Sequence, residues 1–245
     1  MSGNQGENPA DPSIKYEHNK LEGRRKFLRY LLRTIGFRYL ARVDRVEGQE
    51  NVPAQGPAIL LINHIAYVDP IVVLHVLPRN IVPMAKIEVY NMPVVGIFPR
   101  LWGVIPVKRG EFDRRAVRHA LAVLAAGEIV LIAPEGTRSS QLQAAKEGIA
   151  YLALRSQAPI IPAALDGTEG FPCLPLNRRW REPGAHVRFG RGFHLKNNTD
   201  LTNRERLSEM TDQAMTALAR LLPEHRRGKY AEKVERELNL IEWLD

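Results

Sequence analysis

A histidine and an aspartate five positions apart, His64 and Asp69, are the residues of this chain best suited to deprotonate a hydroxyl group. A neutral imidazole accepts a proton from an attacking oxygen while its other nitrogen keeps its own proton, and a nearby carboxylate fixes that tautomer. Five positions along an ideal helix leave two side chains about 140° apart. We therefore expect the pair to meet in a turn, with His64 as general base and Asp69 as its orienting group.

The segments beside this pair predict where it lies. Residues 57–62 form a short apolar run typical of a buried strand, and Asp69-Pro70 before further apolar residues is typical of a helix start. His64 is therefore expected in a strand-to-helix turn, where α/β proteins usually bind ligands. Asp69 has an alternative role as the cap of that helix, and the pattern leaves both roles open.

Two further segments place charged groups after apolar runs. Residues 103–110 contain Lys108 and Arg109, whose cations suit phosphate oxygens. Residues 133–140 contain Glu135, which could accept hydrogen bonds from polyol hydroxyls, and Arg138, which could hold an anion. For each segment the alternative is an ordinary charged surface turn.

The rest of the pattern supplies the elements that must position these side chains. Apolar runs predict strands, and amphipathic patterns with end signals predict helices. The strands are expected at 43–47, 57–62, 81–85, 129–133, 159–165 and 186–190, and the helices at 69–75, 114–126, 146–155 and 202–222. Their alternation predicts an α/β fold in which a mixed β-sheet is flanked by helices on both sides.

The composition excludes several classes of protein. The chain has 245 residues, 44% hydrophobic and 25% charged, which is ordinary for a globular domain. Its single cysteine, Cys173, excludes an internal disulfide, and no histidine or cysteine spacing typical of metal sites is present. We therefore expect no metal and no cofactor. No apolar run approaches the roughly 18 residues of a spanning helix, so the chain is not expected to cross a membrane.

The positive charge is concentrated in residues 20–45, where nine basic and two acidic residues account for +7 of the net charge of +8. Basic and apolar side chains alternate there at helical spacing, represented by Arg25, Arg29 and Arg33 and by Phe27, Leu31 and Ile35. This predicts an amphipathic helix on an anionic membrane surface. The alternatives are a helix packed on the domain with a solvated basic face, and a nucleic-acid-binding arm. The aliphatic face disfavours the arm, so no nucleic-acid partner is expected.

Taken together, these segments resemble the glycerolipid acyltransferase family typified by 1-acylglycerol-3-phosphate acyltransferase. Family members carry an Asn-His block completed by Asp after four residues, a Gly to Arg block, a Phe-Pro-Glu-Gly-Thr-Arg-Ser block and a proline-containing apolar strand. This chain has counterparts in the same order at 63–69, 103–109, 134–139 and 161–162, and the similarity extends from about residue 43 to 230. Ala66 and Ala133 depart from the usual serine and phenylalanine, without removing an ionisable group.

The resemblance implies a role for each motif residue. His64 would be the base and Asp69 its orienter, while a second set would bind the glycerol phosphate. That set is Arg109, Glu135, Gly136, Thr137 and Arg138, with Lys86 as an addition. The implied reaction moves a fatty acyl group from acyl-CoA or acyl-carrier protein to the sn-2 hydroxyl of 1-acylglycerol 3-phosphate. The product would be phosphatidic acid, made for phospholipid biosynthesis without an acyl-enzyme.

Several acceptors share this chemistry, so glycerol 3-phosphate, another lysophospholipid or an acyl-amino acid are alternatives. A non-catalytic membrane-binding protein with a lipid pocket is an alternative from a different class. The chain is expected to divide into a disordered segment 1–19, a membrane-association helix 20–45, an acyltransferase domain 46–230 and an acidic tail 231–245. The resemblance and the basic helix predict a peripheral or monotopic protein at the cytoplasmic face of the cell membrane.

Overall fold

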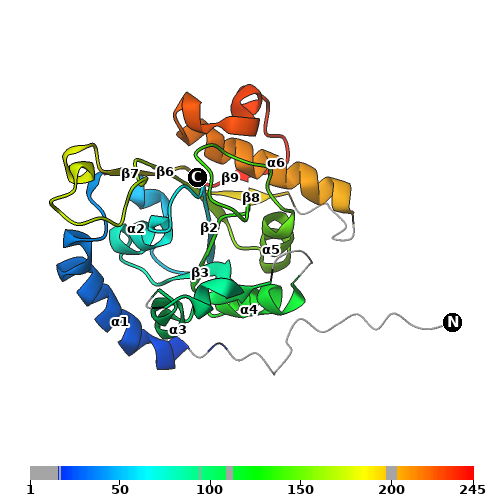
Figure 1. Cartoon of the computed structure of the whole chain (residues 1–245). Helices are drawn as coiled ribbons and strands as arrows, with labels where there is room; N and C mark the ends of the chain where they lie inside the picture. Colours follow the sequence, from blue (N-terminus) through cyan, green and yellow to red (C-terminus); the bar gives the residue numbers. More distant parts are fainter. Residues whose placement is uncertain (1–15, 17, 94, 109–112, 197–202) are drawn as a thin grey trace.

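The computed structural model describes residues 16, 18–93, 95–108, 113–196 and 203–245. In this part of the chain, strands alternate with helices as the sequence predicts (Figure 1). The strands are β1 Val43–Glu47, β2 Ala58–Ile62, β3 Ile81–Lys86, β4 Ile105–Val107, β5 Ile129–Ile132, β6 Ile160–Asp166, β7 Ala185–Phe189, β8 Phe193–Leu195 and β9 Ile241–Trp243. The α-helices are α1 His18–Thr34, α2 Asp69–Val76, α3 Ile97–Trp102, α4 Arg114–Ala125, α5 Gly148–Ser156 and α6 Arg204–Leu221. Short 3-10 helices are η1 Gly36–Arg38, η2 Gln49–Asn51, η3 Ile87–Asn91, η4 Arg178–Arg181, η5 Glu224–Arg226 and η6 Gly228–Lys233.

Within the described residues, nine strands form one mixed sheet in the order β1-β7-β6-β2-β5-β3-β4, with β8 beside β6 and β9 beside β8. The central strands β6, β2, β5, β3 and β4 run parallel to one another. Strands β7 and β8 are antiparallel to β6. Because parallel strands end at the same edge, the segments that follow β2, β5, β3 and β4 meet at one side of the sheet.

Strand β2 shows why the sheet is buried on both faces. All five of its residues are buried, and successive side chains of a strand point to opposite faces. Ile59 and Leu61 join one apolar cluster, which packs against α4, α5 and α6. Leu60 and Ile62 join another cluster, which packs against α2 and α3. Figure 1 shows these two sets of helices on either side of the sheet. The predicted mixed sheet with helices on both faces is therefore confirmed.

The structure corrects several expected boundaries. Residues 20–45 are not one helix, because α1 ends at Thr34 and β1 begins at Val43 as part of the main sheet. The expected acidic tail 231–245 contributes strand β9, which pairs with β8. Strands β4, β8 and β9 were not predicted, because each has only three residues and forms through tertiary pairing. Of the segment 1–19 expected to be disordered, residues 1–15 and 17 lie outside the described residues, and α1 begins at His18.

Arg25, Arg29 and Arg33 of α1 donate hydrogen bonds to carbonyl groups of the domain, which corrects the predicted basic membrane face. Arg25 is fully buried, and its Nε donates to the carbonyl of Trp102 at 2.7 Å. Its Nη1 donates to the hydroxyl of Tyr16. Arg29 donates to the carbonyl of Pro78 and Arg33 to that of Leu77, so the basic stripe lies along the end of α2. The guanidinium groups therefore attach this helix to the domain.

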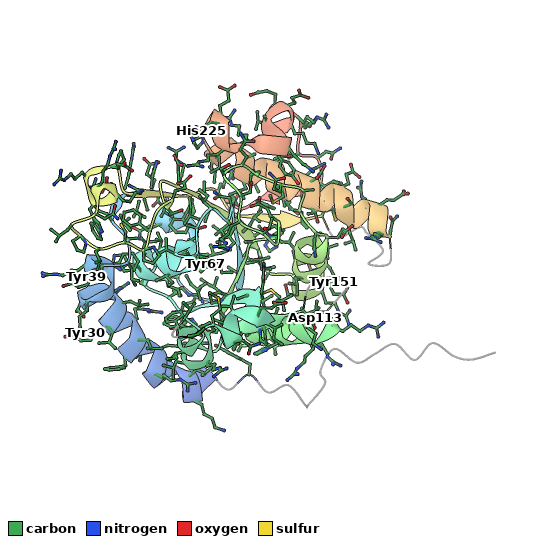
Figure 2. All side chains as sticks on the ribbon, viewed as in Figure 1. Tyr30, Tyr39, Tyr67, Asp113, Tyr151 and His225 are labelled. Atoms are coloured by element: carbon green, nitrogen blue, oxygen red, sulfur yellow. The ribbon has the colours of Figure 1, made fainter. Side chains whose placement is uncertain are left out.

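Two aromatic side chains of α1 face outward, while Leu28 of the same helix packs against the apolar cluster around α2 and α3. Phe27 is 61% exposed and Tyr30 is 64% exposed, while Leu31 is half-buried. Ile35 and Tyr39, just beyond the helix, are 57% and 51% exposed. Figure 2 shows Tyr30 and Tyr39 at the outer edge of the molecule. The predicted membrane residues Phe27 and Ile35 are thus accessible, whereas Arg25 is not.

Replacing Arg25 by alanine is expected to lower the free energy of unfolding by about 2 to 4 kcal/mol, because the Trp102 carbonyl loses a buried donor and the side chain leaves a void. The matched control is Arg24→Ala, whose side chain is exposed. Urea unfolding of both variants measures the difference. Equal stability of the two variants would contradict the structural role of Arg25.

Candidate active site

His64 and Asp69 meet in the turn between β2 and α2, as the sequence predicts. His64 Nδ1 lies 2.9 Å from Asp69 Oδ2. The aspartate is fully buried, whereas the His64 side chain is 22% exposed. Pairing of Nδ1 with a carboxylate fixes the tautomer that leaves Nε2 without a proton. Nε2 is therefore the nitrogen that can accept a proton from an incoming hydroxyl.

The Asp69 carboxylate also organises the turn itself. Its Oδ2 accepts hydrogen bonds from the backbone N–H groups of Ile65 at 2.6 Å and Ala66 at 2.8 Å. Asp69 is the first residue of α2 and not its cap, since the cap position is Val68. One oxygen thus folds the turn back on itself and holds the imidazole. Of the two roles left open by the sequence, the structure has the orienting one.

The loop after β5 lies directly against this turn. Glu135 Oε1 accepts a hydrogen bond from the backbone N–H of His64 at 3.2 Å, and Oε2 accepts from the N–H of Gln143 at 2.8 Å. The N–H of Ser139 donates to the His64 carbonyl at 2.9 Å. Both backbone groups of His64 are therefore bound by this one loop.

Burial raises the pKa of Glu135 to about 7, although its two backbone donors act in the opposite direction. The side chain is 7% exposed. Glu135 was expected to bind acceptor hydroxyls. In the structure both of its oxygens bind backbone groups, so its position is that of a scaffold for His64.

Asn63 fixes the other flank of the turn. Its side-chain amide donates to the carbonyl of Leu165 at 2.9 Å and accepts from the N–H of the same residue at 2.8 Å. Because Leu165 belongs to β6, these two hydrogen bonds extend the β2–β6 pairing by one residue beyond the end of β2. The His64 turn is thus held from both neighbouring strands.

Arg138 is exposed, and its guanidinium carbon lies 3.2 Å from the ring centroid of Tyr67. Tyr67 belongs to the His64 turn and is 52% exposed. The stacking brings a cation from the β5 loop over the His64 turn, where an anionic group of a ligand could meet it. Thr137 is also exposed, and Gly136 has a left-handed φ of 68° that glycine adopts without steric cost.

The C-terminal region holds the β5 loop in place. Arg226 Nε donates to Asp166 at 2.8 Å, and its Nη1 donates to the carbonyl of Ser140 at 3.0 Å. The N–H of Leu142 donates to the Arg226 carbonyl at 2.9 Å. Sequence reasoning missed Tyr67, Asn63 and Arg226, because their partners are distant in the chain and no spacing pattern indicates them.

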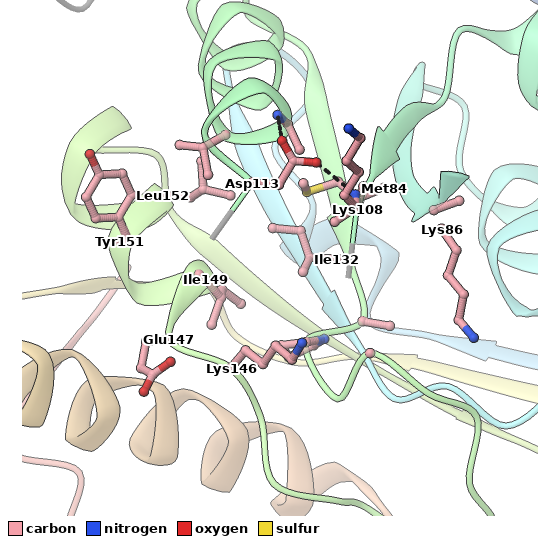
Figure 3. Close-up of a pocket in the computed structure, with 18 of the residues that line it drawn as sticks. Met84, Lys86, Lys108, Asp113, Ile132, Lys146, Glu147, Ile149, Tyr151 and Leu152 are labelled. Carbon is pink, nitrogen blue, oxygen red and sulfur yellow. Dashed lines mark hydrogen bonds between the residues drawn. The ribbon is translucent and has the colours of Figure 1, made fainter. Parts of the chain in front are cut away.

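A cleft of about 790 Å³ opens beside the β5 loop, between the sheet, α4 and α5 (Figure 3). Its apolar wall includes Met84, Val107, Ile132, Ile149, Leu152 and Leu207. Its polar lining includes Lys86, Lys108, Asp113, Lys146, Glu147, Tyr151 and Arg204. Gly136 joins the cleft to the motif loop, whereas His64 and Asp69 do not line it. Lys86 therefore stands at the cleft, and Arg109 lies outside the described residues.

Comparison with known proteins agrees with these motifs. The acyltransferase family profile matches residues 44–166, from β1 to the end of β6. The 1-acyl-sn-glycerol-3-phosphate acyltransferase of Bacillus subtilis is 30% identical over 169 residues, which are 69% of this chain and 82% of that protein. The chain belongs to the acyltransferase family.

Another relative and a solved structure agree with this assignment. The human 1-acyl-sn-glycerol-3-phosphate acyltransferase alpha is 31% identical over 168 residues, 66% of this chain and 59% of that protein. The chain thus spans less than two thirds of the human relative. The crystal structure of the 1-acyl-sn-glycerophosphate acyltransferase PlsC from Thermotoga maritima has a TM-score of 0.57 at 23% identity, covering 78% of this chain and 79% of its own. That likeness shows a shared fold.

As an O-acyltransferase, the protein transfers an acyl group to a hydroxyl oxygen, and the His64 pair is the arrangement that such a step needs. The structure brings together His64, Asp69, Glu135 and Arg138 within two adjoining loops. Lys86 lies at the end of β3, across the cleft from Lys146 (Figure 3).

Among the described residues, no group of three or more histidine, cysteine or acidic side chains could hold a metal ion.

Glu135→Gln is expected to change how stability depends on pH. The unfolded carboxyl releases its proton near its ordinary pKa of 4.5, while the folded one keeps it up to about pH 7. The Glu135 contribution to the free energy of unfolding is therefore largest below pH 4.5 and falls as pH rises to 7, by about 3 kcal/mol at most. Denaturant unfolding at several pH values measures this decrease in the free energy of unfolding. The glutamine variant should not show it, because its side chain does not titrate.

The matched control is Glu147→Gln, which changes a partly exposed carboxylate that pairs with Arg204. At pH 8 the Glu135 variant should also be less stable than the parent by about 1 to 3 kcal/mol, because the amide has one acceptor oxygen where the carboxylate has two, and one backbone N–H loses its acceptor. A Glu135 variant with the same pH profile as the parent would contradict the burial of this group.

Proposed function

We propose that this acyltransferase moves a fatty acyl group from a thioester, acyl-CoA or acyl-carrier protein, to the sn-2 hydroxyl of 1-acylglycerol 3-phosphate. The product is phosphatidic acid, a precursor in phospholipid biosynthesis. The observation that carries the proposal is the contact between His64 Nδ1 and the buried Asp69 carboxylate, with the ring partly exposed. The printed names of the bacterial and human relatives support the choice of acceptor.

In this mechanism the sn-2 hydroxyl approaches Nε2 of His64. The oxygen attacks the thioester carbonyl carbon while its proton passes to Nε2, and Asp69 stabilises the imidazolium through Nδ1. The tetrahedral intermediate then expels the thiolate, which takes the proton from His64. The C–O bond has replaced the C–S bond and the imidazole is neutral again. Because both substrates are held at once, positioning supplies much of the rate enhancement.

The acceptor phosphate is proposed to bind beside the exposed guanidinium of Arg138. This group stands over Tyr67, a residue of the same turn as His64, so a phosphate bound there would present a nearby hydroxyl to the base. Lys86, the last residue of β3, is proposed as a further phosphate ligand. Arg109 is proposed with it because of the family resemblance. Gly136 and Thr137 would contribute through the backbone of the β5 loop. The apolar wall of the cleft suits an acyl chain.

The enzyme is proposed to work on a membrane surface, where its acceptor resides. No helix in the described part of the chain is long and apolar enough to span a bilayer. Instead, α1 and the residues after it present Phe27, Tyr30 and Ile35 to the outside. Aromatic and aliphatic side chains of this kind enter the headgroup boundary of a bilayer. The cytoplasmic face of the cell membrane is the proposed location.

His64→Ala is expected to lower kcat for acyl transfer by at least about 10³-fold with little loss of stability, because the base is removed and its backbone bonds remain. Asp69→Asn should also lower kcat strongly, since it disturbs the tautomer. Thiol release from acyl-CoA in the presence of 1-acylglycerol 3-phosphate measures turnover. His225→Ala, an exposed histidine on η5, is the matched control. Normal turnover by the His64 variant would refute the mechanism.

Arg138→Ala is expected to raise the KM for 1-acylglycerol 3-phosphate by about tenfold, with a smaller effect on kcat, because a charge-assisted bond to phosphate is lost. Tyr67→Leu should give a weaker version of the same effect, and Tyr67→Phe should restore the parent value because it keeps the aromatic face. Arg155→Ala, an exposed arginine of α5, is the control. Unchanged KM in the Arg138 variant would remove this residue from the phosphate site.

The identity of the acceptor is tested separately. The same thiol-release assay is run with glycerol 3-phosphate, other lysophospholipids and an acyl-amino acid in place of 1-acylglycerol 3-phosphate.

A further inference from the structure

The connection between β6 and β7, residues 167–184, presents two leucines that the catalytic site does not use. Leu176 is 96% exposed and Leu174 is 72% exposed, the highest values among the exposed large hydrophobic residues of the described chain. A single exposed leucine is ordinary on a protein surface. Two at alternate positions of one projecting segment form an apolar tip.

The base of this segment makes several contacts with the rest of the loop. The two leucines are therefore exposed on a supported segment and not on an unsupported one. Arg179 donates to the carbonyls of Gly167, Glu169 and Pro183. Its guanidinium also lies 4.2 Å from the ring centroid of buried Phe171. Trp180 Nε1 donates to the carbonyl of Cys173 at 2.7 Å. These contacts fix the backbone that carries the apolar tip. Binding of the tip to another surface would therefore cost little further conformational entropy.

Positive charge flanks the apolar tip. Arg178 has a side-chain exposure of 92%, and Arg181 is also exposed. Glu182 lies 3.7 Å from Arg178, and this exposed pair leaves the short helix η4 with a positive balance. Leucines beside exposed arginines match an anionic bilayer, since the apolar groups enter the acyl boundary while the cations meet lipid phosphates.

The segment is tied to the region of α1. Arg42, just before β1, donates from Nη1 to the carbonyl of Trp180 at 2.7 Å. Figure 1 shows the segment and α1 on the same side of the molecule, and Tyr39 in Figure 2 lies between them in the same view. The apolar tip and the exposed side chains of Phe27, Tyr30 and Ile35 thus lie toward the same side of the molecule.

We propose that residues 174–181 form a second membrane-contact element, which inserts Leu174 and Leu176 into an anionic bilayer while Arg178 and Arg181 contact its phosphates. This inference rests on the proposed function at a membrane surface. Two contact elements, joined through Arg42, fix the rotation of the enzyme on the bilayer as well as its attachment. A single helix would leave rotation about its own axis free.

The test uses the full chain with a fluorescent NBD label at position 176, made as Leu176→Cys in a Cys173→Ser background. The matched control carries the label at Ser208→Cys, an exposed position on α6 across the sheet. Vesicles of phosphatidylcholine with phosphatidylglycerol should increase and blue-shift the emission at 176, and not at 208. Leu174→Ser with Leu176→Ser should weaken vesicle binding about tenfold or more, because two inserted leucines are lost. Leu174→Ile with Leu176→Ile should restore it.

The outcomes separate this inference from the proposed function. Turnover of a soluble short-chain acceptor should remain unchanged in the Leu174→Ser, Leu176→Ser variant. If the label at 176 does not respond while Phe27→Ser with Tyr30→Ser abolishes vesicle binding, the second element is overturned and membrane attachment through α1 stands. If the label responds to acyl-carrier protein without vesicles, the segment is a protein-docking site and the inference is wrong. If the parent enzyme binds no vesicles yet transfers acyl groups, both membrane proposals fail and the chemistry stands.

Discussion

The backbone of His64 is held on both sides by the loop after β5, and the geometry of the site depends on this attachment. Glu135 accepts the His64 N–H, and the N–H of Ser139 donates to the His64 carbonyl. Because the main chain is fixed in this way, the imidazole needs only the Asp69 contact to set its orientation. The same loop carries Arg138, so the base and the exposed cation share one support. Movement of this loop would therefore displace both.

The sheet order explains why these loops can meet. Strand β2 lies between β5 and β6 and pairs in parallel with both, so its carboxyl end emerges between their carboxyl ends. Glu135 holds the turn from the β5 side, and Asn63 bonds to Leu165 on the β6 side. Arg226 then joins Asp166, the last residue of β6, to Ser140 in the loop after β5. The His64 turn is thus held by β6 and by the loop after β5, and Arg226 links these two segments to each other.

The strand, turn and helix around His64 could be predicted from the sequence because each depends on a local residue pattern. A buried strand, a turn and a helix start around His64 follow from apolar runs and from Asp69-Pro70, and the predicted contact between His64 and Asp69 is present. The partners of Glu135 were not predictable, because they are backbone groups that no residue pattern displays. The predicted orientation of the basic stripe of α1 was wrong for a related reason. A basic stripe has the same spacing whether it faces solvent or the carbonyls of another helix.

The attachment of α1 to the end of α2 links the proposed membrane surface to the His64 turn. Arg33 donates to the carbonyls of His75 and Leu77, and Arg29 to that of Pro78, all at the carboxyl end of α2. Cations are favoured there by the helix dipole and by carbonyls that lack intrahelical partners. The first residue of the same helix is Asp69, and eight residues of α-helix span only about 12 Å. The basic residues of α1 therefore fix the exposed apolar side chains relative to the orienting carboxylate, so contact with a bilayer at α1 would set the position of His64 relative to the lipid.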